Sequence, residues 1–269
     1  MSRSLPRTGC ARLLVSMLLT ATLPAAAADF PEIKAKGVLR VLVMPDTRRP
    51  EFYSIRPGTP PGFDAEVLDH FAALHKLRLE VVPQNGWDAL IPALQAKKGD
   101  VIAGRFTATE GRKKLVSFTS EVFPTRNVVI NRKPRKPITT LEQLKAEKVG
   151  TNKGSSMAEA IAAAGVPNVD DSLPPGAYDE ALKSGKISAA LWGVESAVAL
   201  QREDPEIQLG MFVGPPASLA YAVRKDEPAL LQALNEYIEN LRKTATWSRL
   251  VVKYFGEAAP EILKKARSE

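Results

Sequence analysis

The chain has 269 residues, 45% of them hydrophobic, which is enough for two lobes that each bury a core of their own. Its 37 basic and 30 acidic residues give a net charge of +7. Charges of both signs are mixed along the chain, without the basic stripe and interleaved aromatic residues of a nucleic-acid-binding surface, so we expect no nucleic-acid partner. Cys10 is the only cysteine, which excludes an internal disulfide. We expect neither a metal nor a cofactor, since phosphate-cradling and dinucleotide motifs are also missing from the sequence.

Residues 1–28 have the three parts of a secretory signal peptide. Three arginines form a basic segment without an acidic residue, an apolar core follows at residues 13–23, and three alanines precede Asp29. The apolar core is short for a membrane span, and an uncleaved membrane anchor is the alternative. We therefore predict cleavage after residue 28 and a periplasmic location.

Strand-like and helix-like runs alternate in the first half of the chain. In order, the pattern predicts a strand at 38–44, a helix at 64–76, a strand at 79–83, a helix at 88–97 and a short strand at 101–103. Asp64 stands where the first of these helices would take its N-cap. Such alternation is typical of an α/β fold with largely parallel sheets, in which ligands bind beyond the carboxyl ends of the strands.

The second half of the chain continues the alternation. The pattern predicts an extended segment at 128–130, strands at 149–151 and 187–191, and helices at 177–183, 228–242, 246–254, from Ser156 and from Glu195. Ser156 and Glu159 have the spacing of a capping box, and Gly165 is placed to end that helix.

The segment after the predicted strand at 101–103 combines a hydroxyl with a guanidinium. Thr107 and Arg112 are five residues apart, and the arginine carries a planar fork of donors that fits a carboxylate with two parallel hydrogen bonds. Thr107 can add its hydroxyl from the same wall. The segment therefore suits the binding of a small carboxylate. The alternative is that it is only the solvent-exposed, basic start of a helix, since two lysines follow the arginine.

The segment from Thr107 to Lys114 reads T-x-T-x-x-R-K-K. It resembles a block in the bacterial periplasmic solute-binding proteins of the polar amino-acid ABC-transporter type, extracellular solute-binding protein family 3. Further blocks that resemble this family lie, in the family's order, at residues 37–43, 62–67, 87–94, 148–156 and 220–225. Together they cover nearly the whole chain after residue 28.

This resemblance implies an α/β fold of two lobes, the type II periplasmic-binding-protein fold, in which each lobe is a mostly parallel sheet flanked by helices. The first lobe would be discontinuous, with residues 29–126 and 219–269, and the second lobe would comprise residues 127–218 with the crossings between the lobes. The resemblance also implies a monomer that closes around a ligand in the cleft and then docks on the membrane permease of an ABC importer.

The resemblance further implies which residues surround the ligand. They are Trp87, Thr107, Arg112, Lys153, Ser155 and Ser156. Thr107 and Arg112 would hold a carboxylate from one lobe, opposite a helix N-terminus of the other lobe, whose free N–H groups attract an anion. Without a binding role, the serines would only cap that helix and Trp87 would only be buried beside its own helix.

Three positions depart from the family's pattern. Arg49 stands where an aromatic residue is usual, Arg105 where a small residue is usual, and Gly193 where an aspartate would bind an ammonium group. A buried ammonium without a carboxylate partner would be costly, so we favour a ligand that is an organic acid without an α-ammonium over an amino acid. The alternatives are that the arginines turn to solvent or pair with acids, or that Glu195 replaces the lost aspartate.

We predict a non-enzymatic binding protein, the periplasmic component of an ABC importer, which captures a small anionic or zwitterionic ligand by hinge closure. One alternative is a dehydratase-type enzyme that acts on a cyclic dicarboxylate, for which Glu195 is the candidate general acid. Another is a detached sensory or accessory module. Because the sequence ends soon after residue 256, we expect no attached signalling or transglycosylase domain.

Overall fold

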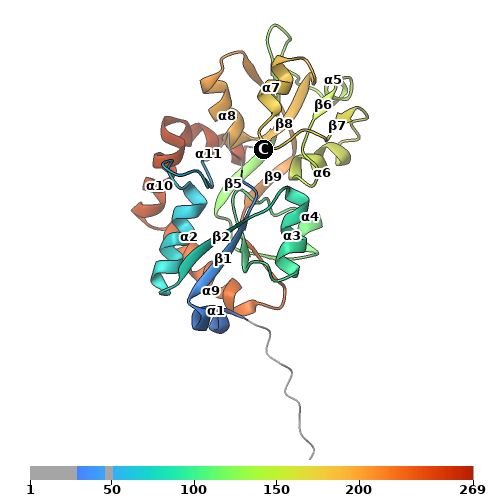
Figure 1. Cartoon of the computed structure of the whole chain (residues 1–269). Coiled ribbons are helices and arrows are strands. Elements are labelled where there is room, and N and C mark those ends of the chain that lie inside the picture. The colour runs from blue at the N-terminus through green and yellow to red at the C-terminus, as the bar shows by residue number, and fades with distance from the viewer. Residues whose placement is uncertain (1–28, 46–50, 269) are drawn as a thin grey trace, which may run out of the picture.

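The computed structural model describes residues 29–45 and 51–268. Two five-stranded sheets with flanking helices lie one above the other, and the chain passes between them more than once (Figure 1). The predicted signal peptide and Arg49 lie outside the described residues. Within the described part of the chain, no helix is long and apolar enough to cross a membrane.

The first lobe is the sheet with strand order β2-β1-β3-β10-β4 and the helices around it. It consists of β1 (Val38–Val43), β2 (Arg78–Pro83), β3 (Val101–Ile102), β4 (Ser117–Phe118) and β10 (Ala222–Val223), with α1 (Phe30–Lys36), α2 (Phe63–Leu74), α3 (Trp87–Gln95), α4 (Glu110–Lys113), α9 (Pro228–Arg242) and α10 (Ala245–Phe255). β1 is parallel to β2 and β3, because α2 and α3 return the chain to the same end of the sheet. β10 is antiparallel to β3 and β4.

The second lobe is the sheet with strand order β7-β6-β8-β5-β9 and its helices. It consists of β5 (Phe123–Arg132), β6 (Val149–Gly150), β7 (Val169–Asp170), β8 (Ala189–Gly193) and β9 (Ile207–Leu219), with α5 (Leu141–Lys145), α6 (Ser156–Ala163), α7 (Tyr178–Lys183) and α8 (Val194–Glu203). β6 is parallel to β7 and β8, whereas β5 is antiparallel to β8 and β9. The predicted α/β fold is confirmed, and both sheets are mixed, because β10 in the first and β5 in the second run antiparallel to their neighbours.

The predicted elements of the first half are confirmed as β1, α2, β2, α3 and β3, each within two residues at either end. In the second half the helices are confirmed, and the strand predicted at 187–191 lies two residues later, as β8. The prediction that Asp64 caps α2 is wrong. Gly62 holds that position, and Asp64 is the second residue of the helix with its side chain buried.

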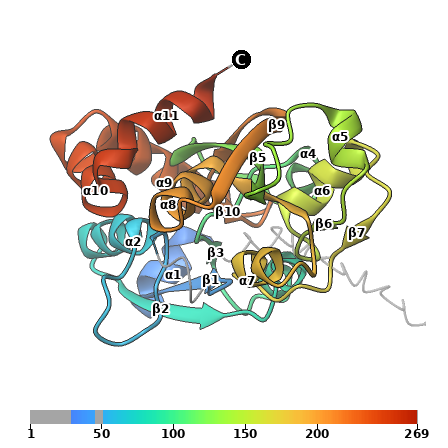
Figure 2. The ribbon, with the colours of Figure 1, turned by 90° about the horizontal axis from the view of Figure 1, so that it is seen from above.

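Two neighbouring strands connect the lobes. β5 leaves the first lobe beside the end of β9, which returns to it, and the two strands pair along most of their length (Figure 2). Beyond the paired region, the N–H of Val122 donates to the Leu219 carbonyl and the N–H of Thr119 donates to the Tyr221 carbonyl, both at 2.9 Å. Any movement of one lobe against the other must therefore bend both connections together.

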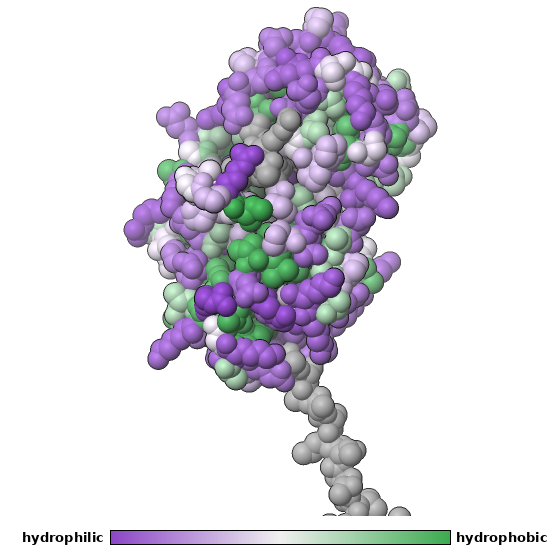
Figure 3. Space-filling model, viewed as in Figure 1, coloured by the Kyte–Doolittle hydropathy of each residue, from purple (hydrophilic) through white to green (hydrophobic). Residues whose placement is uncertain are grey.

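The core is continuous from one lobe to the other. One apolar cluster contains Phe63 of α2, Phe123 at the start of β5 and Phe255 at the end of α10. The ring centroid of Phe123 lies 5.7 Å from that of Phe63 and 4.7 Å from that of Phe255. On the molecular face that Figure 3 shows, hydrophobic residues gather near the middle, and the upper and lower ends are mostly hydrophilic.

The last helix, α11 (Ala259–Arg267), crosses to the second lobe. It contacts β5 and α8, whereas α10 contacts α2 and α9 of the first lobe. Arg126 of β5 donates a hydrogen bond to the Ser268 carbonyl, and Arg267 pairs with Glu121 at 2.7 Å. The sequence assigned residues 219–269 to the first lobe throughout, but these contacts place α11 against the second lobe.

Candidate functional site

A small enclosed cavity lies between the two lobes, where several strands end. Its lining contains Trp87, Arg105, Thr107 and Arg112 of the first lobe, and Thr125, Asn127, Ser155, Ser156, Met157, Gly193 and Glu195 of the second. Except for Arg49 and Lys153, all the predicted ligand-binding residues line it. The cavity has a volume of about 10 Å³, roughly the space of one water molecule. In this closed arrangement the side chains of the two lobes therefore fill most of the space between them.

Arg112 links the lobes through its guanidinium. Its Nη1 donates to the Thr107 carbonyl of its own lobe and its Nη2 to the Gly154 carbonyl of the other, both at 2.9 Å. The guanidinium lies 4.1 Å above the Phe106 ring, and Glu159 is the nearest carboxylate, at 3.9 Å from Nε. Burial lowers the pKa of Arg112 to about 10, so the side chain stays charged at neutral pH. A carboxylate would be a stronger acceptor for this fork than the two neutral carbonyls.

Arg105 is held in the site by a buried carboxylate. Both Gly104 and Arg105 have left-handed backbone angles, with φ of 83° and 64°. Their N–H groups donate to the same oxygen, Oδ2 of Asp64, at 3.0 and 2.9 Å, and the Tyr221 hydroxyl donates to Oδ1 at 3.2 Å. Arg105 itself donates to the Ser196 hydroxyl of the second lobe at 2.5 Å. Burial raises the pKa of Asp64 to about 6, although these three donors and the Arg105 charge oppose the shift.

Glu195 reaches into the cavity from the first turn of α8. The Thr125 hydroxyl donates to its Oε2 at 2.6 Å. Its carboxylate covers the end of β8 so closely that a Cβ atom on Gly193 would lie 2.2 Å from Oε1 and 2.7 Å from Cδ. Burial raises the pKa of Glu195, although the Arg105 charge and the Thr125 hydroxyl act in the opposite direction. The carboxylate thus occupies the volume in which a side chain at position 193 would begin.

The sequence reasoning missed Thr125 and Asn127 of β5. Both side chains line the cavity, and Asn127 lies directly opposite Gly193 in the β5–β8 pair. The two residues are polar and two positions apart in β5, so they share one face of the strand, and this spacing was a signal that could have identified them. Asp64 was noticed only as a cap, because its contacts with Gly104 and Arg105 are 40 and 41 residues distant in the chain.

The second-lobe loop before α6 differs from its prediction at the N-cap of the helix. The N-cap of α6 is Ser155, whose hydroxyl accepts from the Ala158 N–H, so the capping box predicted to begin at Ser156 is wrong by one residue. Ser156 instead lies 3.1 Å from the Thr107 hydroxyl. The role predicted for Lys153 stays a prediction. Its side chain does not line the cavity; it is 78% exposed and lies 3.9 Å from Asp88 of the first lobe.

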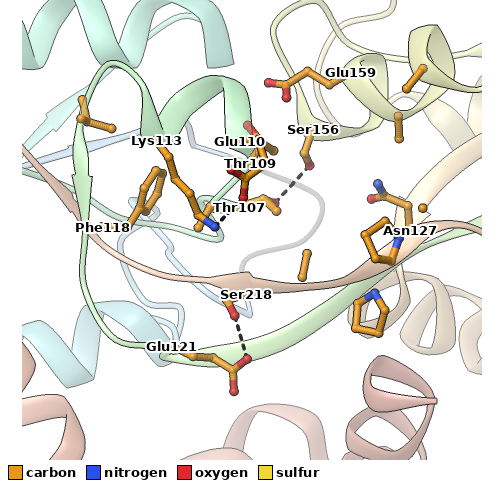
Figure 4. Close-up of a pocket in the computed structure, with 18 of the residues that line it drawn as sticks. Thr107, Thr109, Glu110, Lys113, Phe118, Glu121, Asn127, Ser156, Glu159 and Ser218 are labelled. Atoms are coloured by element: carbon orange, nitrogen blue, oxygen red, sulfur yellow. Dashed lines mark hydrogen bonds and ion pairs between the residues drawn. The ribbon is translucent and has the colours of Figure 1, made fainter. Parts of the chain in front are cut away.

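A larger groove of about 1180 Å³ adjoins the cavity. Thr107, Asn127 and Ser156 line both, so the contact between the Thr107 and Ser156 hydroxyls stands at their boundary (Figure 4). At the groove's edges, Lys113 pairs with Glu110 and the Ser218 hydroxyl donates to Glu121. Among residues 29–45 and 51–268, no group of three or more histidine, cysteine or acidic residues is placed to hold a metal ion.

The two lobes approach each other closely at Gly154. Its φ is +71°, and a Cβ atom there would lie 2.7 Å from the backbone nitrogen of Asp88 in α3. The same residue's carbonyl accepts from Arg112. The closed arrangement therefore needs a glycine at this position, for its backbone angle and for the missing side chain.

Comparison with known proteins gives one family and several relatives. Residues 39–257 match the bacterial extracellular solute-binding proteins, family 3. The chain is 27% identical over 256 residues to the histidine-binding periplasmic protein of Escherichia coli strain K12, which covers 91% of this chain and 96% of that protein. A solved structure of a mutant ArgBP from T. maritima superposes with a TM-score of 0.76 at 28% identity, over 84% of this chain and 99% of that one.

A further relative is membrane-bound lytic murein transglycosylase F of Desulfosudis oleivorans. It is 26% identical over 224 residues, which make up 80% of this chain and 48% of that protein. The chain therefore spans about half the length of this transglycosylase.

We expect Gly154→Ala to hold the lobes apart, because the added methyl group would meet the Asp88 backbone across the cleft. The radius of gyration of the purified protein, measured by small-angle X-ray scattering, should increase. Gly185→Ala is the matched control, since Gly185 has the same φ of +71° with nothing within 4 Å of the added atom. Both variants carry a left-handed strain of roughly 1–2 kcal/mol. Equal radii in the two variants would contradict the close approach at Gly154.

Asp64→Asn should change how stability depends on pH. The pKa of Asp64 rises from 3.8 to about 6 on folding, so the folded protein binds the proton more tightly than the unfolded chain. The contribution of Asp64 to the free energy of unfolding therefore falls as pH rises through this window. Relative to Asp64→Asn, the wild-type free energy of unfolding should decline by up to about 3 kcal/mol between about pH 4 and pH 7.

Urea unfolding at several pH values measures this difference. Asp69→Asn, at an exposed position of the same helix, is the control and should follow the wild-type curve. A wild-type curve parallel to that of Asp64→Asn would show that Asp64 keeps an ordinary carboxyl pKa.

Proposed function

The chain belongs to the bacterial extracellular solute-binding proteins, family 3, and we propose that it delivers a small carboxylate-bearing solute to the permease of an ABC importer. In this proposal the protein works as a periplasmic monomer after cleavage at residue 28. In this proposal residues 29–126 with 219–269 form one lobe and residues 127–218 the other; β5 (Phe123–Arg132) spans the boundary, and α11 packs against the second lobe.

The proposal rests on the burial and the hydrogen-bond partners of the Arg112 guanidinium. Within the described part of the chain, this deeply buried guanidinium donates its hydrogen bonds to neutral carbonyl oxygens, one from each lobe, and Glu159 lies farther away, 3.9 Å from Nε. A solute carboxylate that replaced the Gly154 carbonyl would bring a full negative charge to the fork and would still bridge the two lobes. The Thr107 hydroxyl, at the same wall, can donate to the second carboxylate oxygen. In this way solute binding and lobe closure use the same side chain.

The cleft must open before a solute can enter. The volume of about 10 Å³ is smaller than any amino acid or organic acid, and hydroxyl and guanidinium contacts join the lobes across it. Opening would bend the paired strands β5 and β9, which are the connections between the lobes. Closure then surrounds the solute with groups from both lobes, a hinge motion that commits it to the protein.

The names of the relatives favour an amino acid as the solute. One is described as histidine-binding and the solved structure is of ArgBP. An organic acid without an amino group is the other class, which the glycine at position 193 favours on sequence grounds. Trp87 would form an aromatic wall for the solute in either case, since it is buried at the cavity with Arg105 6.0 Å from its ring.

A dehydratase is a second candidate, favoured by one observation. Glu195 is a buried acid with a raised pKa in a cavity that also contains Arg105 and Arg112, as a general acid acting on an anionic substrate would require. Incubation of the purified protein with prephenate tests this function. Turnover that disappears in Glu195→Gln would support it, and the absence of product would leave the binding protein as the function.

Replacement of Arg112 tests the binding function. A thermal-shift screen of L-amino acids and small organic acids, on protein stripped by unfolding and refolding, first identifies a solute. Arg112→Ala should then weaken binding by on the order of 2–5 kcal/mol, because a buried carboxylate loses its partner. That loss is about 30-fold to several thousandfold in Kd.

Isothermal titration calorimetry measures these affinities. Arg112→Lys should recover only part of the loss, because lysine keeps the charge but lacks the fork. Arg78→Ala, an exposed position on β2, is the control and should bind as the wild type does. Binding to Arg112→Ala at wild-type affinity would exclude Arg112 as the partner of the carboxylate.

A further inference from the structure

We propose that Glu195 binds the ammonium group of an α-amino acid, and that position 193 is glycine because the Glu195 carboxylate needs its space. This inference rests on the proposed function, since it concerns the same cavity. It selects the amino acid over the organic acid that the sequence favoured. The geometry at Gly193, the position of Thr125 and the distribution of charge in the cavity support it independently.

The first support is steric. The Glu195 carboxylate folds back over the end of β8, where a Cβ on residue 193 would approach Oε1 to 2.2 Å, Cδ to 2.7 Å and Oε2 to 2.8 Å. Real Cβ atoms do not tolerate such distances, so no side chain at position 193 is compatible with this Glu195 conformation. The φ of Gly193 is −63°, an angle that any residue adopts. With Glu195 in this conformation, the glycine leaves space for the carboxylate, and its backbone angle does not call for a glycine.

The second support is the way in which the carboxylate is oriented. Thr125 donates to Oε2 from β5, the strand paired with β8, and its own side chain is buried. Glu195 is also in the first turn of α8, where the helix dipole favours a negative charge. Both groups favour the ionised carboxylate, which is the form that binds an ammonium.

The third support is the arrangement of charge. Glu195, Arg105 and Arg112 line one cavity, so one carboxylate and two guanidinium groups are available to one small molecule. An α-amino acid carries both complementary charges, whereas an organic acid would bring a second carboxylate next to Glu195. Burial raises the pKa of Glu195 more than Arg105 and Thr125 lower it, so a further positive group beside the carboxylate would be stabilising.

The experiment compares each L-amino acid that binds with its des-amino acid, which keeps the carboxylate and the side chain. The wild type should bind the amino acid at least about 30-fold more tightly than the des-amino acid, and Glu195→Gln should remove most of this preference. Glu195→Gln preserves the side-chain shape, so the affinity of the same variant for the des-amino acid is the reference against which its loss of amino-acid binding is measured.

Two further variants separate the position of the charge from its presence. Gly193→Ala should weaken amino-acid binding although it removes no polar group, because its methyl group displaces the carboxylate. The double variant Gly193→Asp with Glu195→Ser moves the carboxylate to the end of β8 and clears the space for it. This double variant should recover much of the preference for the amino acid that Glu195→Gln loses.

The outcomes distinguish this inference from the proposed function. If Glu195→Gln and Gly193→Ala bind the amino acid as the wild type does, Glu195 is not the partner of the ammonium, although the protein still binds an amino acid. If the wild type binds only organic acids, the inference fails and the binding function stands. If no solute of either class binds, the proposed function fails.

Should Glu195→Gln fold poorly by circular dichroism, Thr125→Val serves instead, since it removes only the hydroxyl that orients the carboxylate. An unchanged preference for the amino acid in Thr125→Val would overturn the inference.

Discussion

The closed form of this protein depends on the hydrogen bonds of one buried guanidinium. Arg112 cannot lose its N–H partners without a large cost, and it finds them in the carbonyls of Thr107 and Gly154, which belong to different lobes. Since Gly154 also allows the α3 backbone to approach, the charge and the glycine together fix how close the lobes come. A ligand that offers a carboxylate to Arg112 competes with the bonds that close the cleft, so recognition and closure are linked.

Two buried carboxylates set the positions of the arginines and of the charges around this guanidinium. Asp64 accepts both N–H groups of the left-handed Gly104–Arg105 turn and so keeps Arg105 directed across the cleft. Glu195 provides a negative charge at the opposite wall, supported by Thr125 and by the start of α8. Each acid has a raised pKa, because burial raises the pKa by more than the neighbouring hydrogen-bond donors and the Arg105 charge lower it. The protein's own groups therefore do not fully stabilise these two buried negative charges. Such incompletely stabilised charges are expected at a site where a charged ligand binds.

The connections between the lobes are compatible with movement around this site. β5 and β9 are paired and pass side by side from one lobe to the other (Figures 1 and 2). The end of α11 is held by the ion pair of Arg267 with Glu121 and by the hydrogen bond from Arg126 to the Ser268 carbonyl. Because Thr125 and Asn127 lie on β5, the connection itself supplies part of the site. A bend of the strand would therefore change the cavity directly.

Much of the fold and part of the site follow from the sequence alone. Periodicity and turn residues determined the order of strands and helices, and the Thr107–Arg112 motif identified the wall to which a carboxylate would bind. The tertiary structure alone decided where the side chains go. It placed Asp64 under the Arg105 turn, brought the exposed Lys153 near Asp88, packed α11 against the second lobe and laid the Glu195 carboxylate over Gly193. The reason is physical: local pattern reports which face of an element is buried, whereas the rotamer of a buried charge depends on partners that folding brings from distant parts of the chain.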